Sequence, residues 1–474
     1  MGKYGVALNW SHWTLTRQRR VLGAAYHRVL LSLTSFGLSK MELAMNYIMR
    51  YILICGLWVF ASWSAIAAEI APRDLVVLRA DSLLDVVSGE LVDQPLVFIE
   101  GDRILKVVTG GGIIPNNATI IELPGQTLLP GFMDMHVHLS SASKDISFLE
   151  SRLQSVPRKT VNAVKNAATT LLAGFTSVRN VGASDYTVIA VRDAIDAGDV
   201  PGPRIWATGP SLGITGGHCD DNYSPPELKQ KSQGIADGPW AVKAKVRENI
   251  KYGANAIKFC ATGGVFSRGT KVGAIQYSLE EMQAIVEESH RRDLVVAAHA
   301  HGTEGIRTAI IAGVDSIEHA SILDDETILL AKEYGTYLSM DIYNTEYTFA
   351  FGKANGVPEE NLKKDEAIGQ VQRDSFTAAV KAGVNMVFGS DAAIYPHGDN
   401  AKQFSRMVTY GMTELQAIQA ATVNAATMMK RNDIAQIKQG FFADIIAVSA
   451  NPLEDISVTE RVSFVMKSGI IYKQ

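Results

Sequence analysis

The chain has 474 residues, of which 47% are hydrophobic, 20% are charged and 8% are aromatic. This composition excludes an intrinsically disordered protein and a multi-span membrane protein, because the apolar residues can fill a core while charges interrupt nearly every long apolar run. The 45 Lys and Arg residues against 49 Asp and Glu leave a net charge of −4, without the basic excess that nucleic-acid binding needs, so no nucleic-acid partner is expected.

The first 67 residues differ from the rest of the chain. Residues 51–68 (YILICGLWVFASWSAIAA) carry no charge, follow Arg50 and contain an A-x-A pattern of small residues at 65–67. This pattern is typical of a secretory signal peptide, and Met45 or Met49 is well placed to start its short basic segment. We therefore predict a leader over residues 1–67 with the signal peptide at about 45–67, and a secreted or periplasmic protein whose only membrane contact is that peptide. A membrane anchor is the alternative, because 18 apolar residues can just span a bilayer.

Short apolar runs separated by turn residues follow this leader. Between residues 74 and 129 the runs DLVVLRA, PLVFIEGDRILKVV and TIIELPGQTLL predict a small antiparallel sheet. Similar runs return only near the C-terminus, in FADIIAVSANP and VSFVMKSGIIYK. Each set alone has too few strands to bury a face, so we expect residues 68–130 and 431–474 to pair as one small β-sandwich domain.

Strands alternate with helices between these two segments. Eight strands are predicted, at Phe132–Leu139, Thr176–Val181, Arg204–Thr208, Ala256–Cys260, Val295–His299, Ser316–Glu318, Tyr337–Ile342 and Met386–Gly389. Capping boxes at Ser278 and Thr413 mark helix starts. Helix C-caps are expected at Gly174, Gly253, Gly313, Gly335 and Gly383. Eight such units over residues 131–430 predict an α/β protein with a (β/α)8 TIM barrel. A doubly wound open sheet is the alternative, but the first strand lacks a following G-x-G-x-x-G.

Polar side chains lie at the predicted carboxyl ends of these strands, where a barrel of this type has its active site. They are His136, His138, Lys258, His299, His301, His319 and Asp391. A single histidine at a strand end is usually a hydrogen-bonded core residue, and even His-x-His alone is ambiguous. Five imidazoles and one carboxylate on the same rim would cost stability unless they bind cations, so the set predicts a metal site.

The sequence around these positions resembles the amidohydrolase superfamily of metal-dependent hydrolases. The resemblance extends from Asp74 to the C-terminus and rests on LLPGFMDMHVHL, the Lys258 strand, HAHG, EHAS, FGSDA and GFFADIIAVSANP. It implies two divalent metal ions, usually Zn²⁺, held by His136, His138, His299, His319, Asp391 and a Lys258 carboxylated by CO₂. It further implies that a hydroxide shared by the metals attacks the substrate carbonyl, that Asp391 passes the proton to the leaving amine, and that His301 contacts the carbonyl or oxyanion.

Within the superfamily the chain most resembles prolidase-like dipeptidases and carboxypeptidases, a branch that includes enzymes hydrolysing the amide of ochratoxin A. The segments that carry this resemblance are GITGGHCDD, IKFCATGGVFSRGT, AAHAHG, SIEHASILDDE and YLSMDIYNTEYT. Such substrates join an acyl group to an amino acid with a free α-carboxylate. His218, Arg268 and Tyr343 each follow a strand and are our candidates for binding that carboxylate, although each could instead support a neighbouring residue. Relatives are often multimers, so a homo-oligomer is also an expectation.

Two other functions stay open at this point. The same metal site could act on a cyclic amide, a lactone or a phosphotriester, and the ligand types suit zinc, cobalt or manganese. A catalytically silent scaffold would be expected to lack metal ligands, whereas all six are present. The three cysteines exclude a disulfide-rich scaffold, and once the leader with Cys55 is removed, Cys219 and Cys260 are equally consistent with one disulfide or two buried thiols.

Overall fold

The computed structural model describes residues 75–141, 150 and 153–474, so the predicted leader and signal peptide lie outside the described residues. Asp74–Gln474 forms one compact unit. Within the described part of this unit, none of the helices combines the length and the apolar character needed to cross a bilayer.

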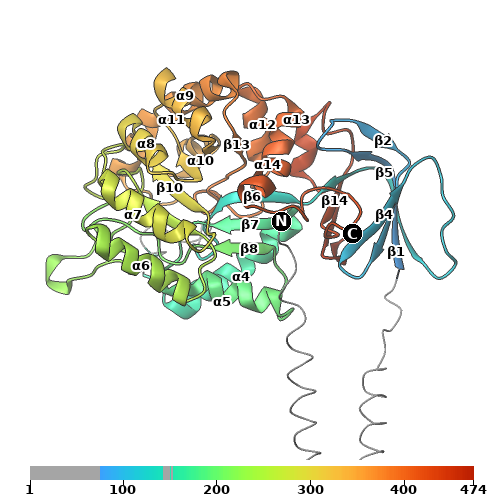
Figure 1. Ribbon diagram of the computed structural model, residues 1–474, viewed down its shortest axis with the longest axis horizontal. Coiled ribbons are helices and arrows are strands. Elements are labelled where there is room, and N and C mark those ends of the chain that lie inside the picture. Colours follow the sequence, from blue (N-terminus) through green and yellow to red (C-terminus); the bar gives the residue numbers. More distant parts are fainter. Residues whose placement is uncertain (1–74, 142–149, 151–152) are drawn as a thin grey trace, which may run out of the picture. The chain divides into compact units, whose positions relative to one another are not determined.

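Strands from both ends of this unit form one mixed sheet (Figure 1). Its strands are β1 (Leu75–Leu84), β2 (Leu91–Asp93), β3 (Leu96–Glu100), β4 (Arg103–Val108), β5 (Thr119–Pro130), β14 (Ile445–Val448), β15 (Phe464–Lys467) and β16 (Ile470–Lys473). They follow the order β16-β15-β14-β5-β1-β3-β4, and β2 pairs with β1. The expected pairing between the two ends of the chain is therefore confirmed.

The pairing of β1 with β5 corrects the expectation of an antiparallel sheet. These strands run parallel, with Val76 opposite Thr119 and Leu83 opposite Leu128, because the β3–β4 hairpin lies between them in the sequence and returns the chain in the same direction. The other edge of β5 pairs antiparallel with β14. The sheet is continuous through β5 and β1, so its division into two facing layers stays a prediction.

Strands β1 and β3 bury apolar side chains on both of their faces. On β1, Leu78 belongs to a core shared with β5 and the C-terminal strands, whereas Val77 packs in a second cluster with Leu96 and Phe98. The alternation of successive side chains along a strand produces this division. Apolar residues at odd and even positions are therefore both needed.

All eight strands predicted in the central region are present. They are β6 (Phe132–Val137), β7 (Phe175–Asn180), β8 (Arg204–Ala207), β9 (Ile257–Cys260), β10 (Val296–Ala300), β11 (Ser316–His319), β12 (Tyr337–Ser339) and β13 (Met386–Val387). β6, β7 and β8 form one parallel sheet, and β9 to β13 form another. Parallel bridges at the edges of the two sheets join Val137 to Ala392 and Leu212 to Phe259.

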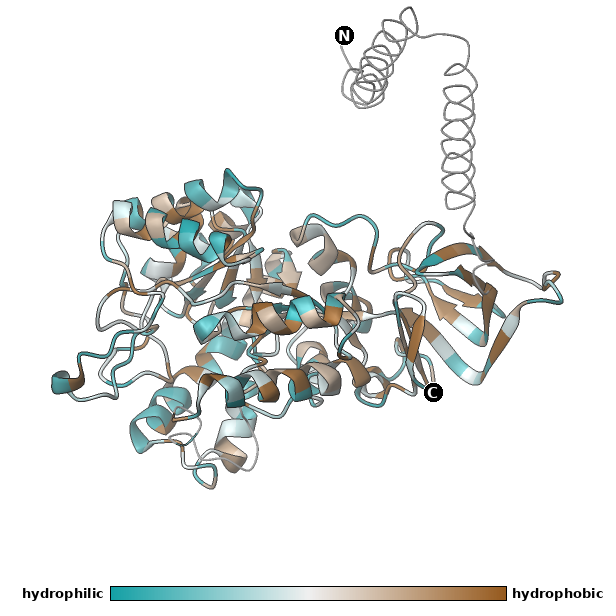
Figure 2. Cartoon of the chain, turned by 90° about the horizontal axis from the view of Figure 1, so that it is seen from below, coloured by the Kyte–Doolittle hydropathy of each residue, from teal (hydrophilic) through white to brown (hydrophobic). Residues whose placement is uncertain are grey.

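Helices separate these strands along the chain. They are α4 (Val156–Leu172), α5 (Thr187–Asp196), α6 (Pro239–Lys251), α7 (Leu279–His290), α8 (Thr303–Ile311), α9 (Asp325–Tyr334), α10 (Asn344–Phe351), α11 (Glu359–Ala382), α12 (Lys402–Thr409), α13 (Glu414–Ala420) and α14 (Val423–Met428). In Figure 2 many helices alternate between polar and apolar colours along their length, as helices with one buried face do. Strands β9, β10 and β11 are buried at every residue, as parallel strands covered by helices are.

Both expected capping boxes and two of the five expected glycine C-caps are present, while Gly174, Gly253 and Gly313 lie one residue beyond the C-caps of their helices. Ser278 and Thr413 form complete capping boxes at the starts of α7 and α13. Gly335 and Gly383 end α9 and α11 in the left-handed conformation, both at φ 70°, where a side chain would be strained. The short turns that follow bring the chain directly into β12 and β13.

Candidate active site

The carboxyl ends of the parallel strands line one cavity of about 780 Å³. The strand register brings these ends level, since His299 of β10 lies opposite both Cys260 of β9 and Glu318 of β11. The predicted residues that line the cavity are His136, His138, Lys258, His299, His301, His319, Asp391 and His218. The side chains expected to carry the chemistry therefore share one space.

Asp391 holds one part of this cluster together. Its Oδ1 lies 3.3 Å from Nε2 of His136 and 3.3 Å from Nε2 of His138. His136, His319 and Asp391 offer three ligand atoms within 4.8 Å of one another. This arrangement has the donor types and the spacing of a metal site.

A second group of three ligand atoms shares His319 with the first. It consists of His299, His301 and His319, whose rings lie 4.6–4.7 Å apart between centroids. The ring of His136 is 5.0 Å from that of His319 and connects the two groups. Because one imidazole nitrogen binds a single ion, His319 can serve only one of the two groups at a time, and the other group needs a further donor such as His138 beside Asp391.

Two of these residues have a left-handed backbone. His319 has φ 70° and Asp391 has φ 54°. Aspartate tolerates this region, but for histidine it costs on the order of 1 kcal/mol, and such strain concentrates at functional sites. The turn at His319 interrupts the strand alternation, so Glu318 and His319 both contact His136 although they are sequence neighbours.

Buried carboxylates orient two of the imidazoles. Glu318 Oε2 lies 2.9 Å from Nδ1 of His136, and Asp341 Oδ1 lies 2.8 Å from Nδ1 of His319. An ionised carboxylate only accepts hydrogen bonds, so each Nδ1 donates its proton and Nε2 is the nitrogen left to face a cation. Partners of this kind hold metal-ligating histidines in the required tautomer and orientation.

Arg179 compensates the charge of Glu318. Its guanidinium is fully buried and donates to Glu318 Oε1 at 2.6 Å, to the Met135 carbonyl at 2.7 Å and to the Ser316 hydroxyl at 2.8 Å. Burial opposes ionisation of Glu318, but the positive charge of Arg179 and the hydrogen bond from His136 hold the pKa of the carboxyl well below its ordinary value. Glu318 therefore stays an anion against His136.

Lys258 lies on β9 beneath the same cavity and is 3% exposed. Burial lowers its pKa to about 8, although the negative charges of Glu318, Asp391 and Asp341 act in the opposite direction. Roughly a tenth of the side chain is therefore a neutral amine at pH 7, far more than for an ordinary lysine. Only the neutral amine can react with CO₂.

The second histidine group contains a buried nitrogen atom that a cation would satisfy. Nε2 of His299 is buried and has no hydrogen-bond partner among the described residues. Burial and the neighbouring imidazoles hold the pKa values of His299 and His301 well below 6.5, so both rings are neutral. A buried, unpartnered imidazole nitrogen is costly, and a metal ion would satisfy it.

An amidohydrolase family model matches residues 127–471. The chain belongs to the amidohydrolase family. An ochratoxinase from Aspergillus niger is 34% identical over 368 residues, which cover 73% of this chain and 75% of that protein. The structure of a Xaa-Pro dipeptidase with bound methionine has a TM-score of 0.79 and 36% identity over 85% of this chain and all of the other. A prolidase in complex with N-methylphosphonate-L-proline has a TM-score of 0.77 and 31% identity over 84% of this chain and 100% of the other.

Two of the residues suggested for substrate binding do not line the cavity of this amidohydrolase. Arg268 is exposed, because the loop after β9 carries it outward. The ring of Tyr343 packs against Tyr395 at 4.9 Å and under the guanidinium of Arg406 at 5.7 Å. Of the three candidates for binding a substrate carboxylate, only His218 therefore belongs to the cavity lining.

Sequence reasoning missed the residues that orient the histidines. Arg179, Asp341 and the carboxylate role of Glu318 were not predicted, although Glu318 directly precedes His319. Asp341 also accepts a hydrogen bond from Gln372 Nε2 at 3.0 Å, and α11 supplies that residue. Arg179, the one charged residue in the strand FTSVRN, was the available signal for the amidohydrolase site.

Proposed function

We propose that the chain is a secreted binuclear zinc amidohydrolase that cleaves the amide bond between an acyl group and a C-terminal amino acid. The gathering of buried histidines and the Asp391 carboxylate around one cavity, with ligand atoms within 4.8 Å of one another, is the observation that carries this proposal. The relatives named ochratoxinase and Xaa-Pro dipeptidase support the substrate class, which extends to dipeptides and ochratoxin-like amides.

The metal ligands in this proposal are His136, His138, Lys258, His299, His319 and Asp391. When bound, two cations lower the pKa of a water molecule and polarise the scissile carbonyl. Lys258 is present as a carbamate, because an ammonium beside two dications would be repelled while a carbamate supplies two anionic oxygens.

Asp391 and His301 act on the substrate. Asp391 is the base that takes the proton of the attacking water and returns it to the leaving amine, and Nδ2 of Asn344 donates to its Oδ2 at 3.2 Å to hold the carboxylate in place. Nδ1 of His301 lies 2.8 Å from the Ser321 hydroxyl. If that hydroxyl donates, the proton of His301 lies on Nε2, where it stabilises the developing oxyanion.

We further propose a closed (β/α)8 barrel and export of the protein. The bridges at both edges of the parallel sheets support closure. A disulfide between Cys219 and Cys260 supports folding in an oxidising compartment, which agrees with the expected signal peptide.

The metal assignment is tested by the metal content of the purified protein. We expect close to two equivalents of zinc or a similar ion per chain, and loss of amide hydrolysis after chelation with recovery on adding zinc. His136→Asn should lower the metal content, whereas the control His290→Asn, at a half-exposed histidine paired with Asp315, should leave it unchanged. Full activity in metal-free protein would contradict the mechanism.

The need for a free carboxylate is tested with paired substrates. Amidation of the substrate C-terminus should lower kcat/KM by roughly 10- to 100-fold, because one charge-assisted interaction is lost. His218, Lys159 and Lys231 line the cavity and offer donors to the carboxylate. Arg268→Gln serves as the control and should leave the discrimination unchanged. Equal rates on both forms would contradict a C-terminal amino acid as leaving group, and a screen of dipeptides, N-acyl amino acids and ochratoxin A would identify the preferred substrate.

A further inference from the structure

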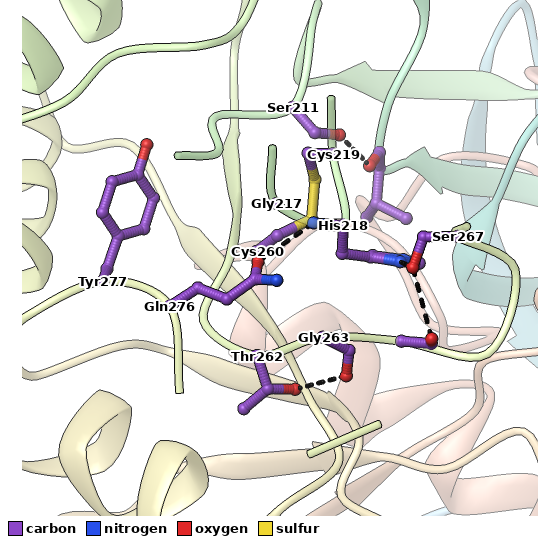
Figure 3. The surroundings of a disulfide bond; sticks show 12 residues. Ser211, Gly217, His218, Cys219, Cys260, Thr262, Gly263, Ser267, Gln276 and Tyr277 are labelled. Carbon is purple, nitrogen blue, oxygen red and sulfur yellow. Dashed lines mark hydrogen bonds between the residues drawn. A yellow bond between two sulfur atoms is a disulfide. The ribbon is translucent and has the colours of Figure 1, made fainter. Parts of the chain in front are cut away.

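A disulfide joins two walls of the active-site cavity. Cys260 is the last residue of β9 and Cys219 lies in the loop of residues 211–238 between β8 and α6, with Cα atoms 6.1 Å apart (Figure 3). Both cysteines line the cavity. The crosslink therefore attaches this loop to the strand that carries Lys258.

His218 directly precedes Cys219 and contacts the metal-site histidines. Its ring stacks on His299 at 4.1 Å between centroids, with an angle of 21° between the planes. Its Nδ1 lies 2.9 Å from the Ser267 hydroxyl, and its backbone N–H donates to Gln276 Oε1 at 3.1 Å (Figure 3). A Cβ atom at Gly264 would approach Cε1 of His218 to 2.4 Å, so a glycine is needed there for the ring to fit.

The loop also has hydrogen bonds on both sides of His218, several of them to other segments of the chain. Leu212, at the start of the loop, is bonded to β9 by its N–H to the Lys258 carbonyl and by its own carbonyl to the Cys260 N–H, each at 2.9 Å. Beyond it, Thr215 bonds to Asp237 and Gly216 bonds to Asp220, both within the loop itself. The disulfide is thus a covalent connection to β9 next to the residue that enters the cavity.

We propose that the Cys219–Cys260 disulfide is a positioning device that holds His218 against His299, where His218 contacts the substrate. This inference rests on the proposed function for the role of His218. The cysteines are positioning residues, because they affect the substrate only through the imidazole of His218.

Reduction of the bond provides the test. A trialkylphosphine breaks the S–S bond and is oxidised to its phosphine oxide with oxygen from water. Both cysteines remain in the chain as thiols, and their protons come from the same water. We expect two additional thiols by titration, a KM for an N-acyl amino acid raised by about tenfold, and a smaller change in kcat. Bound metal should be unchanged, and reoxidation should restore KM.

The double variant Cys219→Ser/Cys260→Ser is the matched control. It should show the raised KM without reduction and should not respond to the phosphine, which excludes an effect of the reagent on the metals. In a His218→Ala background, breaking the disulfide should change KM little, because the bond acts through that ring. An equal effect with and without His218 would mean that the bond only stabilises the fold, and would overturn the proposal.

Backbone hydrogen exchange tests, without any substrate, whether the disulfide holds the loop in place. Reduction should speed exchange in residues 211–238 while β9 and β10 stay protected. Unchanged exchange with both thiols free would overturn the proposal. Failure of the oxidised enzyme to hydrolyse any amide would instead refute the proposed function, and the exchange comparison would still decide whether the disulfide positions the loop.

Discussion

Replacing Asp391 by asparagine is expected to lower kcat for amide hydrolysis by about 10³- to 10⁴-fold while the fold is kept. Asparagine has the same shape but cannot take a proton, and it removes the negative charge that faces His136 and His138 at 3.3 Å. The left-handed backbone at this position, φ 54°, also suits asparagine, so the substitution adds no strain. Steady-state kinetics and circular dichroism of the variant would measure both effects.

Asp293→Asn is the matched control for this change. Asp293 is exposed and has nearly the same backbone conformation, with φ 58°, but lies in the turn after α7. The control should keep the wild-type kcat. An Asp391→Asn enzyme with more than a tenth of wild-type activity would exclude Asp391 as the base.

Replacing Arg179 by methionine is expected to lower the free energy of unfolding by about 3–5 kcal/mol, because it leaves the buried Glu318 carboxylate without its cation. The guanidinium and the carboxylate are both fully buried and lie 2.6 Å apart. Urea unfolding of the variant and wild type would measure the difference. Arg291→Met removes an exposed pair with Glu287 and, as the control, should cost about 0–1 kcal/mol.

The effect of Arg179→Met depends on pH with a defined sign. The pKa of Glu318 in the folded state is below its ordinary value, although burial alone would raise it. A carboxylate of this kind stabilises the fold above its unfolded pKa and loses that contribution as the pH falls. The difference between the variant and wild type should therefore shrink as the pH falls below 4.5 towards the lowered pKa of Glu318, and a difference that grows on acidification would refute the ion-pair explanation.

The strands and the donor set were predictable because both leave local patterns. Apolar runs such as VVAAHA and the spacing of His136 and His138 depend only on neighbouring residues, and the structure places these side chains in one cavity. The ion pair of Arg179 with Glu318 joins β7 to β11, 139 positions apart, so neither residue predicts the other. The strand alternation also assigns Glu318 and His319 to opposite faces, and only the left-handed turn at His319 places both beside His136.

Loop residues show where prediction from sequence stops. His218, Arg268 and Tyr343 all follow strands, yet only His218 lines the cavity. The course of each loop is determined by contacts far away in the sequence, such as Cys219 with Cys260 or Tyr343 with Tyr395. A polar residue after a strand is therefore weak evidence for a substrate contact.

The eight-stranded sheet can form fully only after the C-terminal strands have been synthesised. One edge of β5 pairs with β1 early in the chain, but its other edge pairs with β14, more than 300 positions later. Until residues 445–473 have been synthesised, that edge has no partner and the core around Leu128 lacks Ile445, Phe464 and Met466. Such long-range closure is slow, and an unpaired apolar edge recruits strands from other chains. Truncation before β14 would therefore yield aggregates and not a shorter enzyme.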